Sequence, residues 1–279
     1  MNKSSLRNRA SSVAAVTFVL LSGSGWAQSI WMGDSKEPSI SLEVLKPNFK
    51  HGDGISTTTS VLFLGIQAAL NDKFVFHGEL PLSHIAVDSS LEDEEFGRSS
   101  DRIGNPYVGI EIRDLAEGLS AEVGARAPLL SADSDEDIGA FAMGVSTELV
   151  DRIEAFLPDT VPVSAALDYR KEVASGFSVR LRGGPSAWIP TKGGDSELFA
   201  LYSAQGWFTA GNLELGGGLS GRQHLTGNSD EDSNVNQVGL GASYGFGRFR
   251  PGVEVRVPLD QSLRDLAGSV IGLNMKVSF

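Results

Sequence analysis

Hydrophobic and polar residues alternate along most of this chain with a period of two. In the terminal stretch SVIGLNMKVSF, the apolar residues Ile271, Leu273 and Met275 alternate with small or polar ones, and the chain ends on Phe279. The stretches SISLEV, PYVGIEIR and FSVRLRGG repeat the pattern earlier in the chain. Alternation that recurs in this way indicates many β-strands, each with one apolar and one polar face.

One β-like stretch breaks the pattern. Thirteen candidate strands can be marked, but an antiparallel barrel whose two ends lie on the same side needs an even number. In 138–149 the apolar residues recur at intervals of three and four, which predicts a helix over about 136–157. Twelve strands then remain, at about 39–49, 58–70, 73–83, 104–113, 118–129, 161–171, 176–188, 197–209, 212–223, 235–246, 249–259 and 269–279.

The polar face of these strands distinguishes two all-β architectures. A soluble sandwich would wet this face, whereas a transmembrane barrel turns its apolar face to lipid and its polar face inward. Strands of about ten residues are longer than the five or six usual in globular proteins. Short turns also alternate with longer acidic loops at 87–102, 226–234 and 260–268. We therefore predict a transmembrane antiparallel β-barrel of about 12 strands, with the soluble sandwich as its rival.

The last strand resembles the C-terminal signature of bacterial outer-membrane proteins, in which apolar residues precede a terminal aromatic at every second position. Met275, Val277 and Phe279 carry this likeness. The resemblance implies that these three residues are the assembly signal read by the outer-membrane assembly machinery. It also implies that the last strand pairs with the first, so that no open edge meets lipid.

The N-terminus has the features of an export signal. Lys3, Arg7 and Arg9 precede the apolar run VAAVTFVLL, and small residues follow up to Ala27, which predicts a signal peptide over 1–27 and a barrel domain over 28–279. A membrane anchor is the weaker alternative, because the run is shorter than a spanning helix needs. This export signal and the barrel together predict location in the bacterial outer membrane.

The amino-acid composition limits the classes of partner that we expect for this protein. The chain has 23 basic, 35 acidic and no cysteine residues, and loss of the three basic residues of the signal leaves a net charge of −15. Such acidity argues against nucleic acid as a partner. The expected partners are outer-membrane lipid and lipopolysaccharide, the assembly machinery and a small-molecule solute. The acidic stretches DSDED and NSDEDSN do not match the EF-hand pattern of a calcium-binding loop. We predict no metal and no cofactor.

Charged side chains on the inward parity are the candidate pore lining. Rings of charge of this kind tune the selectivity of pores, but the same charges could neutralise one another and fill the lumen as a polar core. The predicted pore-lining residues are Glu43, His77, Glu79, Glu111, Arg113, Glu122, Arg126, Asp168, Arg170, Arg180, Arg182, Glu214, Glu254 and Arg256.

The predicted helix lies in the extracellular connection between the fifth and sixth strands. Its apolar stripe would be wet if it faced solvent, which favours a helix packed in or over the barrel mouth, where it plugs or gates the lumen. An exposed or interfacial helix, or two short strands, are the alternatives. The stripe that we expect to form the plug contains Phe141, Val145, Leu149, Ile153 and Phe156.

A catalytic role has little support in the sequence. None of the four histidines lies in a HExxH pattern or in a recognisable nucleophile setting. His77 and Glu79 share the inward face of one strand, which leaves a membrane-embedded hydrolase as a minor alternative. We therefore predict a protein that is not an enzyme.

The chain resembles a family of proteobacterial outer-membrane proteins associated with phenol meta-pathway degradation. The likeness lies in the stretch DRIGNPYVGIEIR, in the long acidic connections and in the helix followed by FLPDTVPVSAALDY. The resemblance implies a channel for small, often apolar or aromatic, compounds, and it carries over no individual site residue. We expect a monomeric passive channel for small solutes. The alternative is a structural or surface-interaction barrel with a closed lumen and acidic extracellular loops.

Overall fold

The computed structural model describes residues 31, 37–49, 55–91, 94–226 and 234–279. The predicted signal peptide over 1–27 lies outside the described residues, as does most of the acidic loop predicted at 226–234. The predictions for these two segments therefore stay predictions.

The described chain forms a closed, 12-stranded antiparallel β-barrel, which confirms the predicted fold class. Thirteen strands occupy twelve positions, because β4 and β5 follow one another along the same neighbour, β3. The strands are β1 (Ser39–Phe49), β2 (Ile55–Ala69), β3 (Phe74–Leu91), β4 (Glu94–Ile103), β5 (Tyr107–Ala116), β6 (Leu119–Arg126), β7 (Thr160–Ala174), β8 (Phe177–Pro190), β9 (Glu197–Ala210), β10 (Leu213–His224), β11 (Asn234–Tyr244), β12 (Phe249–Pro258) and β13 (Ala267–Ser278).

The barrel closes where the last strand meets the first. β13 pairs with β1 over its whole length, from Ser39 opposite Ser278 to Phe49 opposite Ala267. β1 therefore begins, and β13 ends, at the same rim of the barrel. The short β2–β3, β5–β6, β7–β8 and β9–β10 turns lie at this rim as well. We call this rim the turn end of the barrel and the opposite rim the loop end.

Alternation along the strands separates two surfaces. On β13, Leu273 is 61% exposed and Ile271 is 51% exposed on the outer face, whereas Lys276 on the inner face is 4% exposed. The exposed apolar side chains form the surface that meets hydrocarbon, and the polar side chains of the other parity face the lumen. Of the assembly-signal residues, Met275 and Phe279 are exposed on the outside and Val277 is half-buried.

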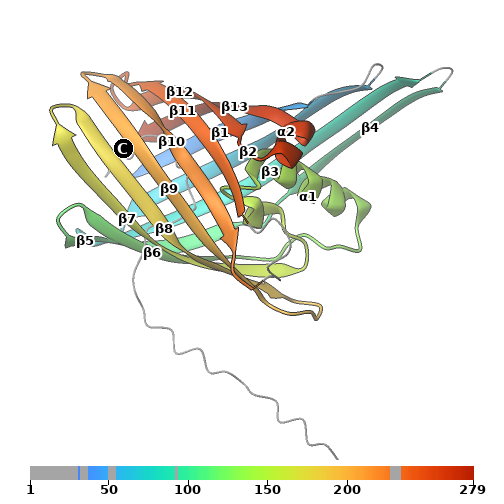
Figure 1. Cartoon of the computed structure of the whole chain (residues 1–279), viewed down its shortest axis with the longest axis horizontal. Coiled ribbons are helices and arrows are strands. Elements are labelled where there is room, and N and C mark those ends of the chain that lie inside the picture. The colour runs from blue at the N-terminus through green and yellow to red at the C-terminus, as the bar shows by residue number, and fades with distance from the viewer. Residues whose placement is uncertain (1–30, 32–36, 50–54, 92–93, 227–233) are drawn as a thin grey trace, which may run out of the picture.

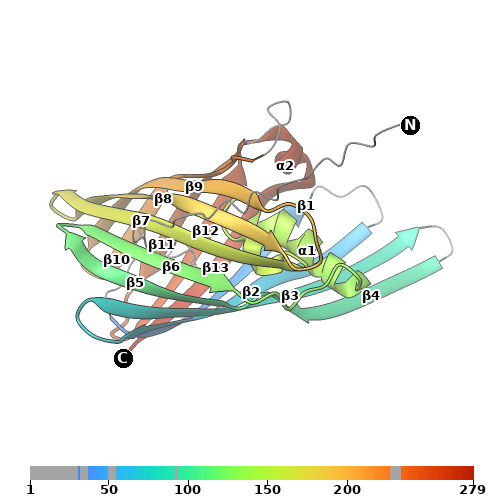
Figure 2. The ribbon, with the colours of Figure 1, turned by 90° about the horizontal axis from the view of Figure 1, so that it is seen from below.

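One acidic loop is instead part of the sheet. The segment 87–102 was expected to be an irregular connection, but β3 continues to Leu91 and β4 returns from Glu94, so that together they form a long hairpin. Figures 1 and 2 show this hairpin extending past the other strands at the loop end. Val87 and Leu91 lie on the opposite parity to the apolar residues Phe74, Phe76, Leu80 and Leu82, so the alternation did not mark the end of this strand.

The predicted single helix over 136–157 is also corrected. The helix α1 spans Asp135–Glu148, the chain then turns, and a 3-10 helix, η1, spans Ile153–Phe156. Ser134 caps α1 by accepting a hydrogen bond from the Asp137 N–H, and three acidic residues occupy its first turn, where the helix dipole favours negative charge. We call residues 135–156 the plug.

The buried face of α1 differs from the predicted stripe. Ala140, Met143 and Gly144 are buried, whereas Phe141 and Val145 are only half-buried. Small residues face inward because the helix lies close against its own continuation: a Cβ on Gly144 would lie 2.7 Å from Cβ of Phe156. The remaining predicted plug residues divide, with Leu149 half-buried and Ile153 and Phe156 fully buried.

Apolar packing fastens the plug to one side of the wall. Phe156 meets Phe63 of β2 edge to face, with ring centroids 6.0 Å apart. Leu45 and Val61 from the wall and Met143 from α1 complete this cluster. Figure 2 shows α1 at the loop end of the barrel, beside β3 and β4.

A second helix, α2 (Gln261–Leu266), lies in the connection predicted at 260–268 and has no buried residue. Neither α-helix of the described chain is long and apolar enough to cross a membrane.

The outer face predicts how the barrel tolerates charge. Changing Leu273 to Arg puts a cation into hydrocarbon near the middle of β13, which should destabilise the barrel by about 2–4 kcal/mol. Urea titration of the protein folded in lipid vesicles, followed by heat-modifiable migration on gels, measures this change. Asn274→Arg puts the same charge at the next residue, which faces the lumen, and should reduce the stability of the barrel much less. Equal losses of stability in both variants would contradict the assignment of the faces.

Candidate functional site in the barrel lumen

The end of the plug carries four charged residues into the lumen. Glu148, Asp151, Arg152 and Glu154 are each no more than 6% exposed. The turn between α1 and η1 points them toward different strands, which a straight helix would not do. Their burial demands partners, because an unpaired charge in a low-dielectric interior is strongly destabilising.

Arg152 pairs with three carboxylates. Its guanidinium donates to Glu43 of β1 at 2.7 Å, to Glu79 of β3 at 2.9 Å and to Glu148 of α1 at 2.9 Å. It also lies over the ring of Phe63, 3.7 Å from the centroid. Burial by itself would lower the pKa of Arg152, but the three carboxylates raise it well above its usual value, so the group stays charged.

Arg256 of β12 extends this network around the wall. It donates to Glu148 at 2.8 Å, to Glu43 at 2.7 Å and to Glu254 at 2.5 Å. Glu148 and Glu43 thus each bind both arginines. The result is a buried charge network that joins β1, β3 and β12 through the plug.

Glu154 makes a separate contact on the opposite side of the lumen. Arg222 of β10 donates to its two carboxylate oxygens, at 2.8 Å each, and Ser186 and Trp188 of β8 donate to Oε1 at 2.9 and 3.2 Å. Burial alone would raise the pKa of Glu154, but Arg222 outweighs it and holds this pKa below its usual value. The contribution of Glu154 to docking is therefore present above its usual pKa and lost as pH falls through the lowered value.

Asp151 contacts a third part of the wall. Its carboxylate accepts hydrogen bonds from Ser220 and Gln237 at 2.7 Å each, and from the indole of Trp31 at 2.9 Å. Burial raises the pKa of Asp151, although Arg256 opposes the change. Trp31 precedes β1 and is 2% exposed, so a residue from the N-terminal side of the barrel meets the plug inside the lumen.

The break between β4 and β5 binds the backbone of the plug. The Asn105 backbone N–H donates to the Ala155 carbonyl at 2.7 Å, and its side-chain amide donates to the Leu157 carbonyl at 2.6 Å. Gly104 permits this approach, because a Cβ there would lie 2.4 Å from the Ala155 oxygen. Arg126 donates to Asn105 and to Glu79, which ties the break to the charge network.

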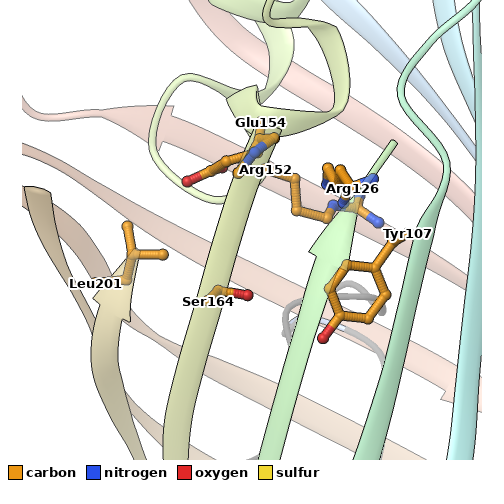
Figure 3. A pocket seen from close by; sticks show the side chains of 7 residues that line it. Tyr107, Arg126, Arg152, Glu154, Ser164 and Leu201 are labelled. Carbon is orange, nitrogen blue, oxygen red and sulfur yellow. The ribbon is translucent and has the colours of Figure 1, made fainter. Parts of the chain in front are cut away.

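Little space remains around η1. A cavity between η1 and the wall has room for about one water molecule. Figure 3 shows Arg152 and Glu154 entering this space from the plug, with Tyr107, Arg126, Ser164 and Leu201 coming from the wall strands. η1 therefore packs closely against this part of the wall.

A second group of charges lies nearer the turn end. His77 Nε2 is 3.0 Å from Glu111 and 3.6 Å from Glu122, and Arg180 Nε donates to Asp168 at 2.7 Å. Their ion pairs join residues of the wall strands to one another. Arg113 pairs with Glu111, Arg182 with Asp168, and Arg170 with Glu214.

All fourteen predicted pore-lining residues lie on the inner parity and are buried or half-buried. Glu43, Glu79 and Arg256 bond directly to plug side chains. The others pair mainly with one another or with neighbouring wall groups. Whether they line a conducting pore stays a prediction.

Sequence reasoning missed Arg222 and the charged end of the plug. Arg222 shares its parity with Glu214 on the same strand, so continued alternation would have found it. β9 could not be oriented, because LFALYSAQGWF is apolar on both parities; in the structure Phe199, Leu201 and Trp207 face inward. No pattern in the sequence indicated that Glu148, Asp151 and Glu154 would be buried.

No protein-family model and no curated protein matches this chain. Its similarity is to solved structures of outer-membrane proteins. An outer-membrane channel from Pseudomonas putida F1 shares 14% identity at a TM-score of 0.57, over 90% of this chain and 99% of that one. The chain has the fold of an outer-membrane β-barrel.

Two further structures share this fold but bear other names. The translocator domain of the autotransporter NalP from Neisseria meningitidis has 12% identity and a TM-score of 0.53, over 89% of this chain and 91% of that one. LpxR from Salmonella typhimurium has 12% identity and a TM-score of 0.50, over 86% of this chain and all of the other. Proteins with different names on one fold mean that function must be argued from the lumen.

The charge network predicts a strong effect of removing Arg152. Arg152→Met leaves Glu43, Glu79 and Glu148 without their shared cation, and breaking a buried pair of this kind costs about 3–5 kcal/mol. The plug should then leave the lumen more often. A cysteine at Met143, unique in this cysteine-free chain and on the buried face of α1, should then react faster with a maleimide.

The same change at Arg102 is the control. Arg102 pairs with Glu136 and Asp137 on the accessible side of α1, where ion pairs contribute little, so Arg102→Met should leave the labelling rate nearly unchanged. Equal acceleration by both variants would show that the buried network does not hold the plug.

Proposed function

We propose that this protein is a monomeric outer-membrane channel for small solutes, closed in the described state by the plug and opened when the plug leaves the lumen. The observation that carries the proposal is the chemistry of the contact between plug and wall. Four charged plug residues meet the wall largely through hydrogen bonds and ion pairs. Water can replace such contacts in an open lumen at a far smaller cost than in a sealed apolar core.

The proposed location is the bacterial outer membrane. An apolar outer band and a polar interior support it, together with the shared fold. The turn end would then face the periplasm, and the plug, the β3–β4 hairpin and α2 would lie toward the outside. Exposed acidic residues at the loop end would meet lipopolysaccharide, bridged by divalent cations.

The proposed solutes are small molecules, including the aromatic compounds implied by the resemblance to phenol meta-pathway proteins. The charged lining of the lumen favours members of this group that carry a polar or charged substituent, because an apolar molecule gains nothing from displacing water from charges. The identity of the solute stays part of the proposal.

A structural barrel with a closed lumen is the second candidate. The observation in its favour is that the charged end of the plug is buried and its charges are paired, as in a polar core. Such a barrel would keep its plug permanently and would expose only its outer loops to partners. Conductance separates the two candidates.

Removing the plug should open the channel. Deletion of residues 138–156 removes η1 and nearly all of α1, so single-channel conductance in planar bilayers should rise and liposomes should swell with small sugars. Unchanged conductance would remove the gating proposal.

A reversible lock provides the matched control. Asp151 and Ser220 are joined by a hydrogen bond of 2.7 Å, so the variant Asp151→Cys with Ser220→Cys can form one disulfide in a chain that has no other cysteine. Oxidised protein should show no openings, and reduction should restore them. A structural barrel would be silent in both states.

We expect the charges of Arg180 and Arg182 to influence the selectivity of the channel between anions and cations. Reversing both charges, with Arg180→Glu and Arg182→Glu, makes the inner wall of β8 negative and should shift the reversal potential toward cation selectivity. Asp195→Lys, at the exposed β8–β9 connection, is a control for charge outside the lumen. An unaltered reversal potential in the double variant would mean that these residues do not line the conducting path.

A further inference from the structure

The wall groups that hold Glu154 form a complete carboxylate receptor. The two terminal nitrogens of Arg222 donate to the two carboxylate oxygens of Glu154. Ser186 and Trp188 each donate a further hydrogen bond to the Oε1 oxygen. The planar fork of an arginine matches the two oxygens of a carboxylate, which makes this arrangement selective as well as strong. All four donors come from β8 and β10, and none comes from the plug.

The receptor is held in place by the wall itself. The guanidinium carbon of Arg222 lies 5.3 Å from the Trp188 ring and 5.4 Å from the Phe199 ring. Phe199 in turn stacks on His224, with centroids 4.5 Å apart and planes 13° apart. Strand register fixes these neighbours, since Ser186 lies opposite Phe199 and Phe199 opposite His224. The site therefore does not need Glu154 to keep its shape.

Arg222 differs from the other arginines around the plug. Arg126 and Arg256 also bind carboxylates of the wall, namely Glu79 and Glu43, and stay neutralised when the plug leaves. In the part of the chain that the structure describes, the carboxylate paired with Arg222 comes from the plug alone. Its buried Nε has no hydrogen-bond partner there, so one donor remains for a further oxygen. Departure of the plug would expose a pre-formed cationic site with no counter-ion.

From this contrast we infer that Ser186, Trp188 and Arg222 form a binding site for the carboxylate of a solute, and that Glu154 occupies it as an internal substitute until the solute displaces it. The inference deepens the proposed channel function and rests on it. It assigns the plug a role beyond obstruction, because the same site holds the plug and recognises the solute.

The neighbouring rings indicate the class of solute. Trp188 and Phe199 give apolar surface next to the donors, which suits an organic monocarboxylate with a compact or planar body. An inorganic anion would use the donors but leave this surface unused. A neutral amide of the same shape lacks the charge that Arg222 requires.

Competition for one site couples binding to opening. A solute carboxylate binds only where Glu154 has left, so its apparent affinity is reduced by the small fraction of protein in that state. By the same linkage, bound solute shifts the population toward the undocked plug. Removing the internal carboxylate should therefore strengthen solute binding.

The test compares benzoate binding to the full-length protein and its variants by titration calorimetry in detergent, with heat-modifiable migration as the check on folding. Glu154→Gln keeps the shape of the side chain but removes its charge, and should bind benzoate about ten-fold more tightly than the unaltered protein. Adding Arg222→Met to this variant should abolish the gain. Benzamide should bind neither form measurably.

Glu148→Gln is the matched control. Glu148 is an equally buried plug carboxylate that pairs with Arg152 and Arg256, so its loss weakens docking but leaves Glu154 to compete. Its gain in benzoate affinity should be clearly smaller than that of Glu154→Gln. Equal affinities in these variants and in the unaltered protein would overturn the inference, as would binding of benzamide or sulfate to Glu154→Gln as tight as that of benzoate.

The outcomes distinguish this inference from the proposed function. If plug deletion raises conductance but Glu154→Gln gains no benzoate affinity, the channel stands and the carboxylate site fails. If Glu154→Gln binds benzoate as expected but no variant conducts, the site stands and the channel fails.

Discussion

Inside a lipid bilayer, a peptide N–H or C=O without a hydrogen-bond partner costs several kcal/mol, and a sheet in that environment cannot keep an open edge. The pairing of β13 with β1 along the whole seam meets this requirement. Closure then divides every strand into an outer and an inner face. It also creates a lumen, and with twelve strands that lumen is wider than the eight-stranded barrels that wall side chains can fill.

The filling of this lumen explains the shape of the plug. Charges of both signs lie on the inner wall, and the plug adds its own at Glu148, Asp151, Arg152 and Glu154. Each buried charge needs a partner on a particular strand, so the chain leaves the helical path after Glu148 and turns into η1. Apolar packing of Phe156 on Phe63 holds one side, and ion pairs hold the others. The plug is therefore firmly placed, although most of its wall contacts are ones that water can replace.

Two of the charged contacts between the plug and the wall differ in their partners. Toward β1, β3 and β12, the wall arginines Arg126 and Arg256 have carboxylate partners on the wall itself. Toward β8 and β10, the wall supplies only donors, and Glu154 completes the site. The ion pairs around Arg152 and Arg256 thus hold the plug in place, whereas the contact between Glu154 and Arg222 is the one that we propose a solute carboxylate can replace. The fold is shared with proteins of other names, so this local asymmetry, rather than the barrel, carries the functional argument.

The alternation of apolar and polar residues was enough to predict the barrel, its twelve strand positions and the inward side of most of its charged strand residues. Alternate residues of each strand face lipid or the polar lumen, so each strand shows the alternation of apolar and polar residues in its own sequence. The sequence did not determine the outline of the plug, the β3–β4 hairpin or the orientation of β9. The buried part of the plug meets charged as well as apolar wall groups, so an apolar stripe does not mark its buried side. Glu154 is 6% exposed and Phe156 is 0% exposed. Which arginine receives which carboxylate depends on strands far apart in the chain, and only the closed barrel brings Arg222 opposite Glu154.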